Sequence, residues 1–234
     1  SLRQQPEAMQ VIKQTAAKQK CRLLIADVSR AKQVKYGLKT QHFSYDKYKN
    51  LSISMPGQYQ IDNAVLAVEA IGALQKAGFP VSEEKLRQGL LQTSWIGRFS
   101  VIGQKPLFIV DGAHNEDAAF RLAESIRFYF TNKRIIYIMG ILKDKEYDKI
   151  IRQTYELAEH IITVTPPNNP RALHGYELAQ NIKEYHESVT VADSLQEAVE
   201  IAYLLAGRDK ETVVILSAIL THRDGAVKSE RNLN

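Results

Sequence analysis

The chain has 234 residues, 44% of them hydrophobic and 24% charged, so it can bury a sizeable core and is not disordered. Its single cysteine, Cys21, excludes an internal disulfide and favours a reducing, cytoplasmic location. The net charge is +5, but the basic residues are spread along the chain and no apolar run approaches the roughly 20 residues that span a bilayer, so we expect neither nucleic acid nor a membrane as a partner. The start has no apolar signal segment and no Met, which indicates a fragment or a processed chain.

Residues 1–55 predict a helix and a few strands. Pro6 fits the first position of a helix that runs to residue 19, and Cys21–Ala26 follows as a short strand. Two β-like runs come next, at His42–Tyr45 and Leu51–Met55. Because so few elements bury too little surface to fold alone, we expect this part to be the end of a larger domain.

Two helices follow, and then a domain boundary. The first helix ends at Gly78, and its apolar face is formed by Ile61, Val65, Val68, Ile71 and Leu74. The second helix begins after the Ser82 cap. A segment rich in special residues comes next, so we place the boundary at about Trp95 and divide the chain into domains 1–94 and 95–234.

From Phe99 onward, strands and single helices alternate. The strands are predicted at 99–102, 107–111, 134–139, 161–165, 189–191 and 212–216. The helices are predicted at 116–130, 146–159, 175–185 and 194–206, and a capping box of Ser194 and Glu197 opens the last one. This alternation is typical of βαβ units, so we expect an α/β fold: a Rossmann-like three-layer domain with a mostly parallel sheet.

The stretch Leu107–Asn115 carries the chemistry of this domain. Its apolar residues predict a buried strand, and Asp111 and His114 follow at the C-terminal end, where open α/β sheets bind ligands. Gly112 permits a close approach of the main chain to a ligand, and Asn115 is placed to cap a helix whose N-terminus is able to hold an anion. The alternative is that Asp111 only caps a turn and His114 is an ordinary surface residue.

The usual nucleotide-binding loops are absent from the sequence. No two glycines stand two residues apart, which excludes a GxGxxG dinucleotide motif, and no glycine precedes a lysine, which excludes a P-loop. The sequence also has no HExxH motif and no zinc spacing. The fold alone therefore does not assign a function.

A set of motifs together resembles one family. The motifs are Gly57-Gln58-Tyr59-Gln60-Ile61-Asp62-Asn63-Ala64, Gly97-Arg98-Phe99, Asp111-Gly112-Ala113-His114-Asn115, Lys143-Asp144-Lys145 and Pro170-Arg171-Ala172. In order and spacing the set is similar to folylpolyglutamate synthase / dihydrofolate synthase, a member of the Mur ligase superfamily, over about residues 57–216. The resemblance implies that residues 1–94 are the end of the family's central ATPase domain and residues 95–234 its Rossmann-like C-terminal domain.

The resemblance implies ATP-dependent amide formation. ATP phosphorylates a carboxylate of a (tetrahydro)folate to an acyl phosphate, and the amine of L-glutamate displaces the phosphate. The P-loop and the ligands of Mg²⁺ belong to an N-terminal region that comes before this part of the family. We therefore expect no metal ligand in this chain, no activity from the isolated chain, and a monomer whose partner is the P-loop domain.

The resemblance also implies roles for individual residues. Asn63 contacts the adenine base, with a helix N-cap as the alternative. Arg98 reaches the phosphates, with a surface ion pair as the alternative. Asp111 contacts the ribose, and His114 faces the incoming glutamate and the reacting carboxylate.

Other segments are harder to assign. The serine that the family places at its glutamate site aligns with Ala218, whereas Ser217 stands one step earlier, so the role of Ser217 as a substrate-binding residue stays open. The charged loop 143–145 is most simply a solvated surface. The tail 221–234 is polar and is expected to be disordered.

Two other functions stay open. One is another Mur-type amide ligase, but related ligases carry Tyr in place of Gly112, which argues against it. The other is a non-catalytic module that binds a nucleotide or folate, which the missing P-loop favours. A Gly-Lys-Ser/Thr motif upstream in the parent gene would distinguish the ligase from the module.

Overall fold

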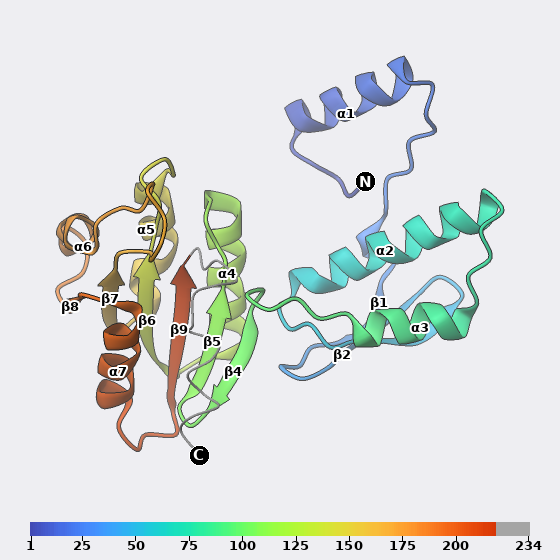
Figure 1. Ribbon diagram of the computed structural model, residues 1–234. Coiled ribbons are helices and arrows are strands. Elements are labelled where there is room, and N and C mark those ends of the chain that lie inside the picture. The colour runs from blue at the N-terminus through green and yellow to red at the C-terminus, as the bar shows by residue number, and fades with distance from the viewer. Residues whose placement is uncertain (219–234) are drawn as a thin grey trace. The chain divides into compact units, whose positions relative to one another are not determined.

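The computed structural model describes residues 1–218 in two compact units, the first from Ser1 to Ser94 and the second starting at Trp95 (Figure 1). The polar tail predicted for residues 221–234 lies outside the described residues. No helix in the described part of the chain is long and apolar enough to cross a membrane.

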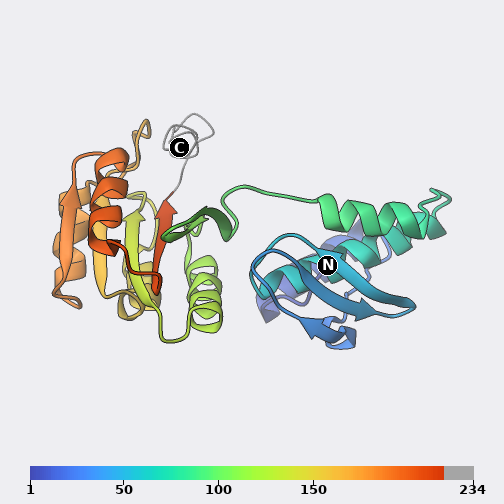
Figure 2. The ribbon, with the colours of Figure 1, turned by 90° about the horizontal axis from the view of Figure 1, so that it is seen from below.

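The first unit combines a three-stranded antiparallel sheet with helices (Figure 2). Its elements are α1 (Pro6–Lys18), the 3-10 turn η1 (Val28–Arg30), β1 (Lys32–Lys35), β2 (Gln41–Tyr45), β3 (Tyr48–Ile53), α2 (Tyr59–Lys76) and α3 (Glu83–Gln92). The strands lie in the order β1-β2-β3. The core of the unit joins the strands to α2 and α3 through buried side chains that include Phe43, Tyr45, Leu51, Ile61, Val65 and Leu86.

The predicted apolar face of α2 is confirmed over most of its length. Ile61, Val65 and Val68 are buried, and the helix ends at Lys76, shortly before Gly78, whose φ of +92° suits glycine. The inward position predicted for Leu74 is wrong. Its side chain is 47% exposed because the buried stripe of α2 ends before the last turn of the helix.

The strand predicted for Cys21–Ala26 is not formed. Two main-chain hydrogen bonds link this segment to Ser1: the Ser1 N–H donates to Leu24 O, and the Ala26 N–H donates to Ser1 O, both at 2.8 Å. A strand needs a neighbouring strand along its length. Within residues 1–218 the main chain of this segment pairs with that of Ser1 alone, so no ladder forms. Conversely, β1 was not predicted because Val34 is its one apolar residue and gives no signal of period two.

The second unit is an α/β domain with a mostly parallel sheet, as predicted. Its strands are β4 (Ser100–Gln104), β5 (Leu107–Asp111), β6 (Arg134–Gly140), β7 (His160–Val164), β8 (Val189–Ala192) and β9 (Thr212–Ala218). Its helices are α4 (Glu116–Tyr129), α5 (Tyr147–Thr154), the 3-10 turn η2 (Tyr155–Leu157), α6 (Gly175–Lys183) and α7 (Leu195–Ala206). The sheet order is β4-β5-β9-β6-β7-β8, and only β4 runs antiparallel to its neighbour.

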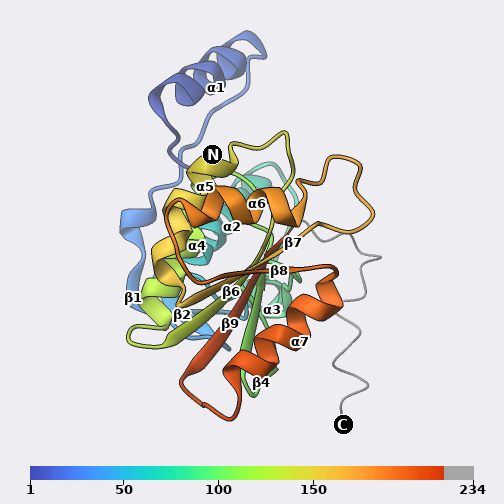
Figure 3. The same cartoon turned by 90° about the vertical axis from the view of Figure 1, so that its left-hand side faces the viewer.

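The helices form the outer layers of this domain. Helices α4, α5 and α6 cover one face of the sheet and α7 covers the other (Figure 3). The face under α7 is lined mainly by buried apolar side chains, which include Phe108, Val110, Val214 and Leu216. Because side chains alternate along a strand, Asp111 and Ser217 point to the opposite face, and the register pairs these two residues directly at the C-terminal ends of β5 and β9.

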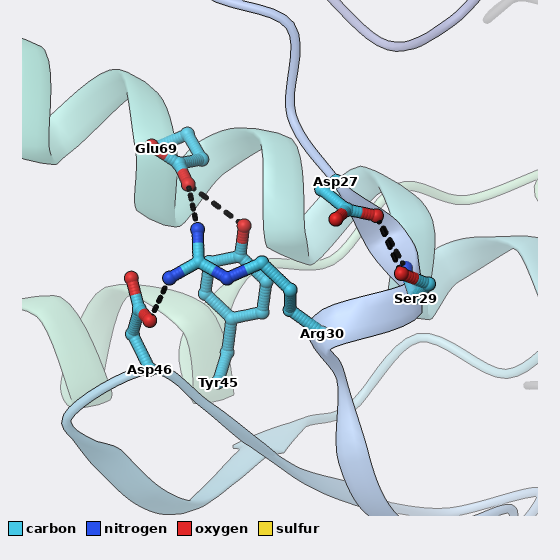
Figure 4. A network of polar contacts seen from close by, with 6 residues as sticks. All are labelled: Asp27, Ser29, Arg30, Tyr45, Asp46 and Glu69. Carbon is cyan, nitrogen blue, oxygen red and sulfur yellow. Dashed lines mark hydrogen bonds and ion pairs between the residues drawn. The ribbon is translucent and has the colours of Figure 1, made fainter.

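A polar network fixes the start of the sheet in the first unit (Figure 4). The Tyr45 hydroxyl is buried and donates to Glu69 Oε1 at 2.7 Å, and burial, followed by this hydrogen bond, raises the pKa of Tyr45 to about 12. The Arg30 guanidinium lies 5.3 Å from the centre of the Tyr45 ring and pairs with Asp46 and with Glu69. The network therefore ties η1 and β2 to α2.

We expect Tyr45→Phe to lower the free energy of unfolding of the first unit by about 1–2 kcal/mol, because Glu69 loses a hydrogen-bond donor. The matched control is Tyr48→Phe, since Tyr48 is also buried on the same hairpin but none of the described residues bonds its hydroxyl. Amide hydrogen exchange in β2 and β3 during a urea titration measures both variants. Equal effects of the two substitutions would contradict a role for the network.

Candidate functional site

Asp111 lies at the C-terminal end of β5 and binds two segments of main chain. Its side chain is 4% exposed. Its Oδ2 accepts a hydrogen bond from the Phe99 N–H and its Oδ1 accepts one from the Ala113 N–H, both at 2.8 Å. The carboxylate therefore holds the turn before β4 against the turn after β5, and each of its oxygens keeps a second lone pair for another donor.

Gly97 and Gly112 bring the same two turns into direct contact. The Gly112 N–H donates to Gly97 O at 2.7 Å, and a Cβ on Gly112 would lie 3.3 Å from that oxygen. Gly97 has a φ of +87°, which a glycine adopts without strain. Gly112 thus serves a close approach between two parts of the chain, where the sequence predicted an approach to a ligand.

Phe99 anchors the first of these turns. It has a φ of +49°, which is unusual for a residue with a side chain, and its ring is fully buried beside Tyr129 and Phe130 at the end of α4. The buried ring and the hydrogen bond to Asp111 together hold this backbone conformation. This conformation could not be predicted from the sequence, because a positive φ at phenylalanine has no residue signature.

Arg98 is presented to solvent by this anchored turn. Its N–H donates to Trp95 O at 3.3 Å, and its side chain is exposed. Within residues 1–218 it forms no ion pair, so the surface ion pair considered as the alternative is not present in the described structure. The guanidinium is therefore available for an anionic group.

His114 is half-buried and its ring is oriented by the main chain. Its Nδ1 lies 2.8 Å from Gly112 O. A carbonyl oxygen only accepts, so Nδ1 carries the proton of this hydrogen bond and Nε2 of the neutral imidazole carries a lone pair. The side chain is thus prepared to accept a hydrogen bond at Nε2.

Ser217 supports the same turn from β9. Its side chain is 3% exposed, and its hydroxyl donates to Ala113 O at 3.3 Å. A neighbour that the sequence did not single out is Tyr137 on β6, whose buried hydroxyl has no hydrogen-bond partner among the described residues. Burial raises the pKa of Tyr137, and the Ser217 hydroxyl lies near it. Ala218 pairs with Gly140 at the end of β9, and its side chain lies outside the described structure.

Asn63 lies in the first unit, on α2. The N-cap of that helix is Gln58, so the N-cap role considered for Asn63 is wrong. The Asn63 Nδ2 donates to Gln60 Oε1 at 2.9 Å, which fixes the orientation of an exposed side chain. Its amide oxygen has no partner among the described residues.

Asn115 caps α4 as predicted, because its side chain accepts a hydrogen bond from the Ala118 N–H at 2.9 Å. Glu116 and Asp117 occupy the first turn, and Glu116 pairs with Lys149 at 3.2 Å. Acidic side chains already offset the positive end of this helix. An anion at this helix N-terminus is therefore less favourable than the sequence suggested.

The two charged loops of the resemblance come together beyond β6 and β7. Residues 142 and 172 form a β-bridge, and the Lys143 N–H donates to Arg171 O at 2.8 Å. Asp144 accepts a hydrogen bond from Arg171 at 3.0 Å and lies 3.9 Å from Lys145. The loop is thus cross-linked by ion pairs, with the Lys143 side chain exposed.

Burial dominates the ionisation of Asp111. Removal from water raises the pKa of its carboxyl above 3.8, and the hydrogen bonds from Phe99 and Ala113 oppose this effect. Within residues 1–218 no group of three His, Cys, Asp or Glu side chains is placed to hold a metal ion. Hydrogen bonds join four parts of the site into one cluster: Asp111, His114, Ser217 and the turn that carries Arg98.

The cluster lies within the part of the chain that matches a known protein family. The family "Mur ligase, glutamate ligase domain" matches residues 97–219. The dihydrofolate synthase/folylpolyglutamate synthase of Bacillus subtilis is 32% identical over 178 residues, which are 72% of this chain and 40% of that protein. The folylpolyglutamate synthase of Lacticaseibacillus casei is 31% identical over 68% of this chain and 37% of its own length. The chain thus spans less than half the length of these relatives.

Solved structures share the fold over nearly the whole chain. A Mycobacterium tuberculosis folylpolyglutamate synthase complexed with ADP has a TM-score of 0.82 at 22% identity, covering 99% of this chain and 53% of that one. The folylpolyglutamate synthase of Thermotoga maritima has a TM-score of 0.69 at 27% identity, covering 92% of this chain and 50% of that one.

The raised pKa of Asp111 predicts a pH dependence of stability. The folded chain holds this proton to higher pH than the unfolded chain, so the stability that Asp111 contributes is present below pH 3.8 and is lost as pH rises through the folded pKa. Urea titrations at several pH values between about 4 and 7 should show wild type losing stability relative to Asp111→Asn. If the stability of wild type relative to Asp111→Asn instead increased with pH, the hydrogen bonds from the two N–H donors would outweigh the effect of burial on the pKa.

Proposed function

Because the chain belongs to the Mur ligase glutamate-ligase family, we propose that it is the C-terminal part of an ATP-dependent ligase that adds L-glutamate to a reduced folate. In this reaction the γ-phosphoryl group passes from ATP to a folate carboxylate, which gives ADP and an acyl phosphate. The glutamate nitrogen then attacks the carbonyl carbon, phosphate leaves, and the nitrogen loses a proton as the amide forms.

The observation that carries the proposal is the cluster around Asp111 inside the matched domain. Its carboxylate fixes the Arg98 turn and the His114 turn at the ligand-binding edge of a parallel sheet. A cation on an anchored turn and an oriented imidazole on the adjoining turn suit a reaction that depends on charge neutralisation and orientation, with no nucleophile from the protein.

We assign the residues as follows. Arg98 neutralises phosphate charge with its exposed guanidinium. Asp111 accepts a hydrogen bond from a ribose hydroxyl through a remaining lone pair of its carboxylate. Asn63 accepts a hydrogen bond from the adenine base through its amide oxygen. His114 accepts a hydrogen bond from the glutamate amine at Nε2.

Ser217 contributes indirectly, by supporting the Ala113 carbonyl next to His114. The Mg²⁺ ligands and the loop that holds the β- and γ-phosphates are placed in the upstream part of the longer protein, since neither a metal cluster among residues 1–218 nor a Gly-Lys pair in the sequence is available for them. We also place the protein in the cytoplasm.

Titration calorimetry with ADP tests the nucleotide role of Arg98 in this chain. Arg98→Ala should weaken ADP binding about tenfold or more, because charge-assisted hydrogen bonds are worth roughly 1.5–3 kcal/mol each. The matched control is Arg121→Ala, an exposed arginine on α4 that pairs with Asp117 and should leave the affinity unchanged. Absence of ADP binding to wild type, or equal losses in both variants, would contradict the proposal.

ADP release in the presence of Mg-ATP, tetrahydrofolate and glutamate tests whether the phosphate-holding loop lies outside this chain. This chain alone should show no release above background, because the phosphate-holding loop is assigned elsewhere. Turnover at about 1 s⁻¹ or faster, a typical enzyme rate, would overturn that assignment.

A further inference from the structure

Tyr137 on β6 carries a buried hydroxyl group that has no hydrogen-bond partner among the described residues. Its side chain is 1% exposed. Leaving a hydroxyl unpaired in an apolar interior costs free energy, so buried hydroxyls are almost always hydrogen-bonded. Ile136 and Ile138 pack into the core under α7, so Tyr137 between them points to the opposite face of the sheet. Asp111 and Ser217 point to this same face.

Two other hydroxyl groups lie near that of Tyr137. Burial raises the pKa of Tyr137, and the hydroxyls of Ser217 and Thr154 lower it, Ser217 more strongly than Thr154. Ser217 comes from β9, where the register pairs it with Met139, two residues beyond Tyr137 on the neighbouring strand (Figure 1). Thr154 is fully buried at the end of α5. Hydroxyls from β6, β9 and α5 therefore lie close together on the face that carries the candidate site.

Two of these three hydroxyls already use their single proton. The Ser217 hydroxyl donates to Ala113 O at 3.3 Å. The Thr154 hydroxyl donates to Ile150 O at 2.9 Å. Neither has a second proton to give, so the Tyr137 hydroxyl pairs with one of them only by donating its own proton.

Ser217 is the better placed acceptor of the two. The Thr154 side chain is β-branched, and its bond to Ile150 O fixes it against its own helix. The bond from Ser217 to Ala113 O is longer than the usual 2.7–2.8 Å of an O–H···O hydrogen bond, so the serine hydroxyl has room to adjust. A hydroxyl that accepts one hydrogen bond also becomes a stronger donor, so a proton from Tyr137 strengthens the bond to Ala113.

The bond from Ser217 acts on the peptide group that leads into His114. Ala113 is held on both sides, because its N–H donates to Asp111 Oδ1 at 2.8 Å and its O accepts from Ser217. The Ala113 carbonyl is one end of the peptide bond to His114. Its orientation therefore sets the direction in which the main chain of His114 starts.

We propose that Tyr137 is a positioning residue of the candidate site. Its hydroxyl donates to Ser217 Oγ, which commits the Ser217 proton to Ala113 O and holds the peptide group that leads into His114. The link joins the central strands β6 and β9 to the turn after β5. The proposal rests on the proposed function only in its consequence for glutamate, the group to which His114 is assigned.

A double-mutant cycle in the whole 234-residue chain tests the hydrogen bond. Tyr137→Phe should raise the equilibrium constant for unfolding of the second unit about fivefold, because Ser217 Oγ loses its donor. In a Ser217→Ala background the same substitution should change this constant less than about twofold, since the acceptor is already gone. The matched control is a Thr154→Val background, in which the effect of Tyr137→Phe should persist. Urea titrations followed through the amide signals of β6 and β9 give the constants.

A second measurement separates positioning from simple stabilisation. The NMR resonance of the isotopically labelled Ala113 carbonyl carbon reports the hydrogen bond of that carbonyl in the folded protein. It should move in the same direction in Tyr137→Phe and in Ser217→Ala, and it should keep its position in Thr154→Val.

An unchanged unfolding constant in Tyr137→Phe would overturn the proposal, and so would an effect that persists in the Ser217→Ala background, because the hydroxyl would then donate elsewhere. Lower stability with an unmoved Ala113 resonance would overturn it as well, since Tyr137 would then contribute to packing alone. Neither readout involves a nucleotide, glutamate or turnover, so failure of this proposal is distinct from failure of the proposed ligase function.

Discussion

The buried carboxylate of Asp111 is the interaction on which the candidate site depends. One side chain accepts N–H groups from Phe99 and Ala113, which lie on two different turns, and the contact between Gly97 and Gly112 reinforces the same junction. Placing a carboxylate in this position costs desolvation, as its raised pKa indicates, and that cost is tolerated because two donors are already in place. The turn that carries Arg98 and the turn that carries His114 are both held at this junction.

The rest of the second unit serves to bring this junction to the sheet edge. The inserted position of β9 between β5 and β6 puts Ser217 beside Asp111, so a residue 106 positions later in the chain reaches the same turn. The mainly apolar face under α7 packs the domain, whereas the polar residues of the candidate site lie at the C-terminal end of the opposite face. The same sheet therefore contributes to the hydrophobic core on one face and positions the residues of the candidate site on the other.

The local features of the fold could be predicted from the sequence, and the long-range ones could not. The strand at 107–111, the Asn115 cap and the capping box, in which the Glu197 N–H bonds Ser194, all follow from short patterns and are confirmed. The partner of Asp111 was not predictable, because Phe99 lies 12 residues away and adopts a positive φ that its residue type disfavours. The segment 21–26 has a strand pattern but lacks the neighbour that a strand requires, which no local pattern reports.

The most direct test of this account is the exchange rate of two amide protons, those of Phe99 and Ala113, in wild type and in Asp111→Ala. If the carboxylate holds both turns, both amides are protected in wild type and exchange about tenfold faster or more in the variant, while the buried amides of Ile138 and Val214 keep their rates and so exclude global unfolding. Unchanged exchange at Phe99 with Asp111 removed would contradict the account, because the turn that carries Arg98 would then be held by something else.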